Sequence, residues 1–142
     1  MFFEDLHLGQ KFPGLRLTVT ETHIVLFGSL TGDMAMLHFD DEKAKASQFG
    51  KRIAHGMLTS SLAMAVVGPI MGQEAATHLE DSFVYRDPVL IGDTIDTMGE
   101  VIELTPKSKW GLVKIGLTTV NQHGRTVLTG WSTVGVRYKT PR

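Results

Sequence analysis

The chain has 142 residues, 42% of them hydrophobic, and its fourteen basic residues nearly balance its fifteen acidic ones. This length and composition predict one folded domain over residues 1–142, and the balanced charge disfavours a nucleic-acid partner, because binding to phosphates needs a basic surface. The absence of cysteine excludes disulfides, thiol catalysis and cysteine-bound metal, and it is compatible with a reducing cytoplasm.

The first part of the chain predicts a strand and a capped helix. Apolar and polar residues alternate over 15–19, as in a short strand. A helix is expected between an N-cap at Thr20 or Thr22 and Gly32, because glycine readily takes the left-handed conformation that ends a helix. Residues 33–39 are expected to form a loop.

Two further helices are predicted in the next part. Asp40 is a suitable N-cap for a short helix ending at Gly50. Segment 56–71 carries apolar residues on every side, which is typical of a buried central helix. With 16 residues interrupted by Pro69 it is too short and too polar to span a bilayer, and the N-terminus lacks the features of a signal peptide. We therefore expect no membrane partner and a cytoplasmic location.

The second half of the chain changes to the period of strands. Alternating segments lie at 83–88, at 94–104 with a bulge near Gly99, at 113–118, and after the turn 121–124 through 131–138. Helices followed by a run of antiparallel strands predict an α+β fold, with a curved sheet around one buried helix.

Asp33 and His38 are the candidate catalytic residues. A carboxylate and an imidazole five positions apart diverge on a continuous helix. Because Gly32 is expected to end the helix, the loop after it can bring both side chains to one point. An imidazole can accept a proton near neutral pH, and a carboxylate beside it can orient the ring or share the proton transfers of a bound water. The alternative is that both residues are structural.

The beginning of the predicted central helix is a candidate oxyanion site. Its first N–H groups have no partner within the helix, and Gly56 leaves room for a ligand to approach them. Such donors suit the negative charge that develops on a thioester carbonyl. We expect His55 to position this helix end, and Lys51 and Arg52 to be phosphate contacts or solvated charges.

Three segments together resemble the motifs of one family. Segment 27–40, which contains the Asp33–His38 pair, resembles the signature of the MaoC-like acyl dehydratases, also called (R)-specific enoyl-CoA hydratases. Segment 54–58 is similar to their second motif, and 84–93 is similar to the start of their sheet. The three follow one another in the family's order.

The resemblance implies a hotdog fold and a homodimer or dimer of dimers. It also implies reversible syn addition of water to a trans-2-enoyl thioester, usually of coenzyme A, giving an (R)-3-hydroxyacyl thioester without a metal or redox cofactor. By position, Asp33 and His38 would activate the water, and the Gly56 N–H would stabilise the enolate oxygen. Ser61 and His55 would belong to the substrate site, with the Ser61 hydroxyl near the catalytic pair.

The sequence departs from the family at two positions. The family usually has Asn-Pro between its Asp and His, where this chain has Ala35 and Met36. Losing the proline removes a fixed φ, and Met36 is a candidate for reshaping the acyl pocket. Two other functions stay open: a hotdog acyl-CoA thioesterase, and an acyl-CoA-binding protein without catalytic activity.

Overall fold

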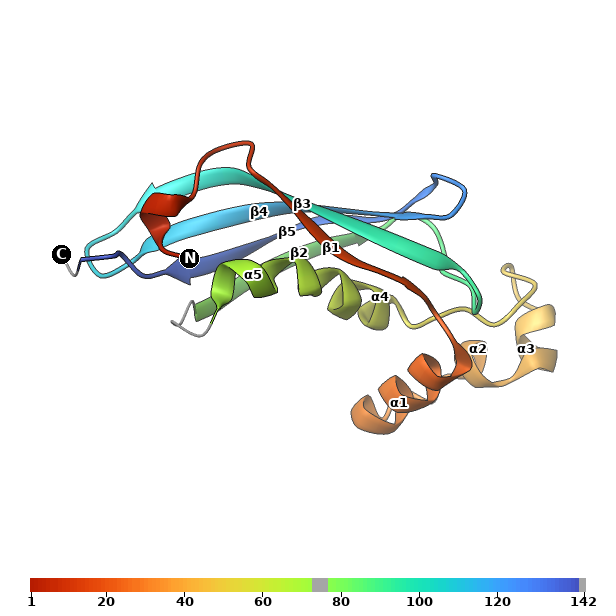
Figure 1. Cartoon of the computed structure of the whole chain (residues 1–142). Helices are drawn as coiled ribbons and strands as arrows, with labels where there is room; N and C mark the ends of the chain where they lie inside the picture. Colours follow the sequence, from red (N-terminus) through yellow and green to blue (C-terminus); the bar gives the residue numbers. More distant parts are fainter. Residues whose placement is uncertain (73–76, 141–142) are drawn as a thin grey trace.

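The protein is an antiparallel sheet with a helix along one face. The computed structural model describes residues 1–72 and 77–140. Within that part five strands form a sheet with the order β1-β3-β4-β5-β2 (Figure 1). The strands are β1 (Lys11–Thr18), β2 (Thr77–Tyr85), β3 (Thr94–Pro106), β4 (Gly111–Asn121) and β5 (Thr126–Val136).

The helical elements fall into two groups. The first group, α1 (Glu21–Thr31), α2 (Met36–Phe39) and α3 (Asp41–Lys45), gathers beyond one end of the sheet, opposite the end that holds both termini (Figure 1). The second group runs along the sheet and comprises α4 (Gly56–Ala63), the 3₁₀ turn η2 (Met64–Val67) and α5 (Gly68–Met71). A short 3₁₀ turn, η1 (Phe3–Asp5), precedes β1.

The predicted central helix 56–71 is present but divided. Its middle tightens to the 3₁₀ turn η2 just before Pro69, which lacks an N–H and crowds the preceding turn. The helix approaches the sheet closely at Gly99, where a Cβ would lie 2.6 Å from Cγ2 of Val66. Glycine in the sheet therefore makes this close contact possible.

The core lies between this helix and the inner face of the sheet. Alternate residues of β4 face inward, which confirms the strand predicted over 113–118. One buried cluster lies under η2 and α5 and includes Val66, Ile70 and Ile115, and a second lies under α1 and the start of α4 and includes Ile24 and Leu58. No helix among the described residues is long and apolar enough to cross a membrane.

Several predicted boundaries are confirmed and others are wrong. Helix α1 begins after Thr20 and ends at Gly32, whose φ is 77°, as predicted. The short helix after Asp40 stops at Lys45 rather than at Gly50, because Ser47 Oγ donates a hydrogen bond to the Ala44 carbonyl and closes the turn.

The other differences lie in the predicted loop and in the strands. Part of the predicted loop 33–39 is the helical turn α2. The register shift between β3 and β4 falls between Val101 and Glu103 rather than near Gly99, which stays paired under Val66. Strand β1 starts earlier than predicted, at Lys11, and β5 ends at Val136 rather than at 138.

Candidate active site

Asp33 follows directly on the end of α1. The Gly32 N–H donates to the Gly28 carbonyl at 2.8 Å, and the positive φ of Gly32 turns the chain out of the helix. The Asp33 N–H then donates to Thr31 Oγ1 at 3.2 Å, and the Ala35 N–H donates to Asp33 Oδ1 at 3.3 Å. These local bonds hold the carboxylate at the surface, where its side chain is exposed.

His38 lies on α2, with its ring nearly buried. Its N–H donates to the Ala35 carbonyl, and its ring Nδ1 lies 2.8 Å from the Ile53 carbonyl oxygen. A carbonyl can only accept a hydrogen bond, so Nδ1 carries the proton and Nε2 keeps its lone pair. The Ile53 carbonyl thus selects the tautomer that a general base needs.

Asp33, His38 and His55 come together in space. One ligand atom of each lies within 4.8 Å of the others. This separation suits a single water bridging the carboxylate and the His38 ring, because each hydrogen bond spans about 2.8 Å. The same three residues could hold a metal ion, but two of their ring nitrogens already bond to backbone carbonyls. The arrangement therefore favours proton transfer to and from a bound water.

His55 is the N-cap residue of α4, and its expected role in positioning this helix end stays a prediction. Its side chain makes no capping hydrogen bond to α4 and is 1% exposed. Instead Nε2 lies 2.9 Å from the Asp33 carbonyl oxygen, and the ring stacks on His38 with centroids 3.8 Å apart. This burial leaves no surface for direct contact with substrate, so a role in the substrate site would be indirect, and that role stays a prediction.

Gly56 begins α4 beside a cavity of about 290 Å³. Its lining includes Ile53, Gly56, Thr59, Tyr85, Val89 and Val127. A Cβ on Gly56 would lie 3.2 to 3.4 Å from three carbons of the Tyr85 ring, so a larger residue here would crowd the wall of the cavity. The start of α4 therefore meets an open space, as an oxyanion site requires.

The two serines of α4 differ in their surroundings. Ser61 is exposed, and its hydroxyl donates at 2.6 Å to the Met57 carbonyl, so this hydrogen bond lies within the helix and not with the catalytic pair. Its contact with substrate stays a prediction. Ser60, which the sequence did not single out, is 1% exposed and lies 3.2 Å from the Tyr85 hydroxyl.

The Arg52 side chain links α1, α2 and α3 to the segment before α4. Its guanidinium donates to both carboxylate oxygens of Glu21 and to Oδ1 of Asp41, at 2.8 to 2.9 Å, and to the His38 carbonyl at 3.3 Å. Glu21 first, and then Asp41, raise the pKa of Arg52 above its ordinary range. Arg52 is thus engaged in internal ion pairs, whereas the sequence offered it as a phosphate contact or a solvated charge.

Lys51 lies at a second, larger opening. A cavity of about 460 Å³ is lined by residues that include Lys45, Lys51, Arg52 and Asp93. Leu90 in its lining forms a β-bridge with Ile53, which lines the first cavity.

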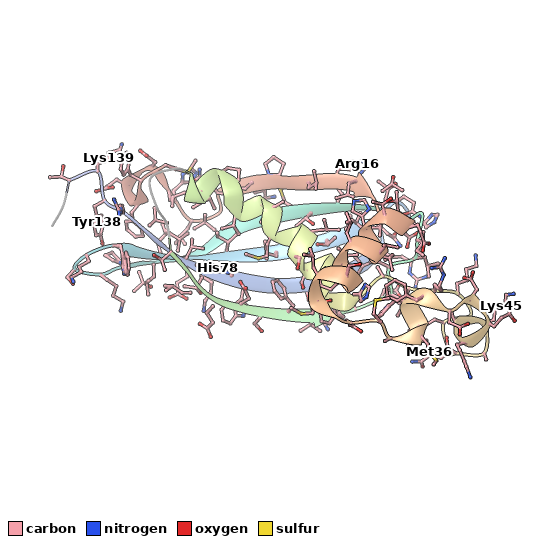
Figure 2. The ribbon with its side chains drawn as sticks, turned by 90° about the horizontal axis from the view of Figure 1, so that it is seen from below. Arg16, Met36, Lys45, His78, Tyr138 and Lys139 are labelled. Carbon is pink, nitrogen blue, oxygen red and sulfur yellow. The ribbon has the colours of Figure 1, made fainter. Side chains whose placement is uncertain are left out.

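Met36 points away from the protein interior. It is 60% exposed and lies at the α2–α3 end of the molecule together with Lys45 (Figure 2). It lines neither of the two cavities. The residue before it, Ala35, has φ −57° and ψ 138°, which is the extended backbone that a following proline favours. The loop thus keeps a proline-compatible shape without the proline.

A serine, a histidine and an aspartate also meet on β2 and β5. His78 Nε2 lies 2.7 Å from Asp81 Oδ1 and 3.2 Å from Ser132 Oγ. In a hydrolase triad the serine and the carboxylate use different ring nitrogens, so that a proton can pass through the ring. Here both contacts are to one nitrogen, and this cluster lacks the geometry of a nucleophilic triad.

Comparisons with known proteins agree with this geometry. A family model described as MaoC like domain matches residues 5–124. An (R)-specific enoyl-CoA hydratase from Rhodospirillum rubrum is 34% identical over 135 residues, covering 95% of this chain and 91% of that protein. The chain belongs to the MaoC-like dehydratase family. The family match spans all three sequence segments, so their resemblance to this family is confirmed. The hydratases and dehydratases of this family are hydro-lyases.

Solved structures confirm the hotdog fold. A Mycobacterium tuberculosis protein described as having a double hotdog fold superposes with a TM-score of 0.86 at 23% identity, covering 98% of this chain and 44% of that one. A monoamine oxidase regulatory protein from Archaeoglobus superposes with a TM-score of 0.91 at 37% identity, covering 99% of this chain and 96% of that one. The unliganded R-hydratase from Pseudomonas aeruginosa superposes with a TM-score of 0.85 at 29% identity, covering 97% of this chain and 86% of that one.

Proposed function

We propose that this MaoC-like protein catalyses the reversible syn hydration of a trans-2-enoyl thioester of coenzyme A to the (R)-3-hydroxyacyl thioester. One observation carries the proposal: a carboxylate oxygen of Asp33 and a ring nitrogen of His38 lie within 4.8 Å of each other. The bond from His38 Nδ1 to the Ile53 carbonyl leaves Nε2 with its lone pair. The relative from Rhodospirillum rubrum, named an (R)-specific enoyl-CoA hydratase, supports the same reaction.

In this mechanism Asp33 and His38 hold one water between them. The pair removes a proton from the water as its oxygen bonds to the β-carbon of the enoyl group. The electrons of the carbon–carbon double bond move toward the thioester carbonyl and form an enolate, which the pair then protonates at the α-carbon. Because one water-binding pair delivers both groups, both add to the same face.

The start of α4 is suited to the enolate. The Gly56 N–H belongs to the first turn, whose N–H groups lack partners within the helix. It lies at the cavity wall, where a thioester oxygen would meet this N–H and the positive end of the helix. Ser61, exposed on the next turn, is proposed to contact the substrate beyond the reacting atoms.

The chemistry proposed here uses no metal or redox cofactor. Proton transfer by a carboxylate and an imidazole is sufficient for adding water to an activated double bond. Dialysis against a chelator should therefore leave the rate unchanged, and a loss that zinc or another divalent ion restores would contradict this part of the proposal.

We also propose that the protein works in the cytoplasm as a homodimer, or as a dimer of dimers. Strand β2 is an edge of the sheet, and it exposes Leu79, Val84 and Tyr85. An edge strand with exposed apolar side chains invites pairing with another chain. Light scattering coupled to size-exclusion chromatography should give at least twice the mass of the 15.6 kDa chain.

The test is hydration of crotonyl-CoA, followed as the loss of enoyl-thioester absorbance. Chiral analysis of the product should give the (R)-3-hydroxyacyl ester, and an assay for free thiol should stay at background. Release of coenzyme A thiol would favour the thioesterase instead. Tight binding of short, long and branched enoyl esters without turnover would favour the binding protein.

A further inference from the structure

His55 contacts both residues of the proposed water-activating pair and is itself closed off from solvent. Its Nε2 lies 2.9 Å from the Asp33 carbonyl oxygen, and its ring stacks on the His38 ring at 3.8 Å with 29° between the planes. At 1% exposure it has no surface on which a substrate could bind. We propose that His55 is a positioning residue that holds Asp33 and His38 in reacting geometry. This inference rests on the proposed function.

The hydrogen bonds of His55 define its tautomer. The Asp33 carbonyl only accepts, so His55 Nε2 carries the proton and Nδ1 has the lone pair. Nδ1 is buried and has no hydrogen-bond partner among the described residues. A buried polar atom without a partner lowers stability, so a ring serving only as packing would be better replaced by an apolar one. The hydrogen bond from His55 Nε2 to the Asp33 backbone carbonyl gives a reason for a histidine here.

The His38 ring is fixed by two contacts of different kinds. The Ile53 carbonyl bonds to Nδ1 at the ring edge and sets which nitrogen faces outward. His55 lies against the face of the ring and sets its plane. Together they aim His38 Nε2, and an error of about 1 Å in such a position can cost a hundredfold in rate.

Residues of the first motif form the support for His55. The rings of Phe27 and Phe39 lie 5.0 and 5.8 Å from its ring. Gly28 makes room for Phe39, because a Cβ there would lie 2.5 Å from the Phe39 ring. The sequence Phe27-Gly28 on α1 and Phe39 on α2 thus encloses the ring that holds the catalytic pair.

Two substitutions separate the two contacts. His55→Phe keeps an aromatic face for His38 but removes the N–H that Asp33 accepts, and His55→Gln keeps an N–H but removes the stacked ring. For each variant we expect kcat to fall about a hundredfold with KM within about threefold of the wild type, because the ring does not touch substrate. His123→Phe and His123→Gln, on the exposed turn before β5, are the matched controls and should keep the wild-type kcat.

A double mutant and a spectrum distinguish positioning from a general loss of fold. Added to His38→Ala, the substitution His55→Phe should lower the residual rate no further, since His55 acts through the pair. Long-range proton–nitrogen NMR of the imidazoles in the wild-type protein should show His38 protonated at Nδ1 and His55 protonated at Nε2. In His55→Gln the Ile53 carbonyl should keep His38 protonated at Nδ1, while broadened His38 ring signals should report the loss of a fixed ring plane.

Three results would overturn the inference. They are a kcat within about twofold of the wild type in both folded His55 variants, a rise in KM alone, or a wild-type spectrum with His55 protonated at Nδ1. If the variants do not fold, two measurements still test the inference. One is the kcat of Gly28→Ala, which should fall because the added methyl displaces Phe39 from His55, and the other is the wild-type spectrum. If the wild type hydrates no enoyl ester, the proposed function fails, and the spectrum tests the positioning separately.

Discussion

The two ends of the molecule are held together by different kinds of contact. The end under α5 is an apolar core, in which Val66, Ile70 and Ile115 are fully buried between helix and sheet. The end formed by α1, α2 and α3 also covers an apolar cluster, which includes Ile24, but it adds side chains that bond to charges and backbone carbonyls, chiefly those of Arg52, His38 and His55. The contacts of the first end are non-directional, whereas those of the second require defined atoms at defined distances.

The two kinds of contact serve different purposes in this fold. Apolar burial is roughly proportional to area and has no direction, so it can stabilise a sheet without placing any atom precisely. Hydrogen bonds and ion pairs depend on distance and angle, so they can place a carboxylate and an imidazole within reach of one water. We therefore expect substitutions in the α5 end to change stability, and those in the α1–α3 end to change activity more than stability.

The largest effect on stability is expected at the α5 end. Ile115→Ala empties a fully buried position on the central strand β4 and should lower the free energy of unfolding by about 2–5 kcal/mol. The kcat of the folded fraction should not change. Ile102→Ala, at a half-exposed position on β3, is the control and should cost less than about 1 kcal/mol in urea unfolding. A drop in kcat for Ile115→Ala would contradict the expectation that substitutions at the α5 end change stability and not activity.

Arg52→Met should affect both quantities, since it removes the ion pairs to Glu21 and Asp41 but keeps the apolar length of the side chain. We expect the free energy of unfolding to fall by about 2 kcal/mol and kcat to fall about tenfold, through displacement of His38. Arg16→Met removes an exposed pair with Asp96 and should change stability by less than about 1 kcal/mol, with kcat unchanged. Equal behaviour of the two variants would show that Arg52 is an ordinary surface charge.

Met36→Pro is expected to stabilise the α2 turn slightly. Met36 is the first residue of α2, and Ala35 before it already has the backbone conformation that a proline favours. The gain should be about 0.4–1 kcal/mol in thermal or urea unfolding. Met34→Pro is the contrasting variant, because the Met34 N–H donates to the Gly32 carbonyl and would be lost. Destabilisation by Met36→Pro would mean that the loop has a different shape.

The smallest effect is expected from an exposed pair at the end that holds the termini. Figure 2 shows Lys139 there, and its Nζ lies 2.5 Å from Asp5 Oδ1. Lys139 first, and then the Phe2 N–H, lower the pKa of Asp5. A carboxyl with a lowered pKa contributes stability above its unfolded pKa and loses it as the pH falls through the folded value.

Lys139→Ala should therefore lower Tm slightly at pH 7 and shift acid unfolding to slightly higher pH. The contribution should be complete above about pH 5. Unfolding followed between pH 2 and 7 by circular dichroism measures this shift, and a midpoint at lower pH than that of the wild type would contradict the sign.

The sequence predicted the features that depend on local pattern. Thr20 and Gly32 bound α1 as expected, because caps and a positive φ are encoded by single residues. The spacing of Asp33 and His38 after Gly32 also predicted correctly that the two side chains come close together, since both residues belong to one short segment.

Features that depend on contacts between distant segments could not be predicted in this way. Arg52 reaches Glu21, 31 positions away, and His55 reaches Asp33, 22 positions away. No periodicity marks such pairs, and the charge of Arg52 next to Lys51 suggested a phosphate contact or a solvated charge instead. The helical turn α2 was missed because four residues carry too little pattern to distinguish a turn of helix from a loop.

The shared water of Asp33 and His38 can be tested by a double-mutant cycle on these two residues with an enoyl-CoA substrate. If the two side chains act on one water, Asp33→Asn and His38→Ala should each lower kcat by about 10²–10⁴-fold with unchanged circular dichroism. The double variant should then be no slower than the slower single variant. A single variant that keeps the wild-type rate, or losses that multiply in the double variant, would contradict the shared water.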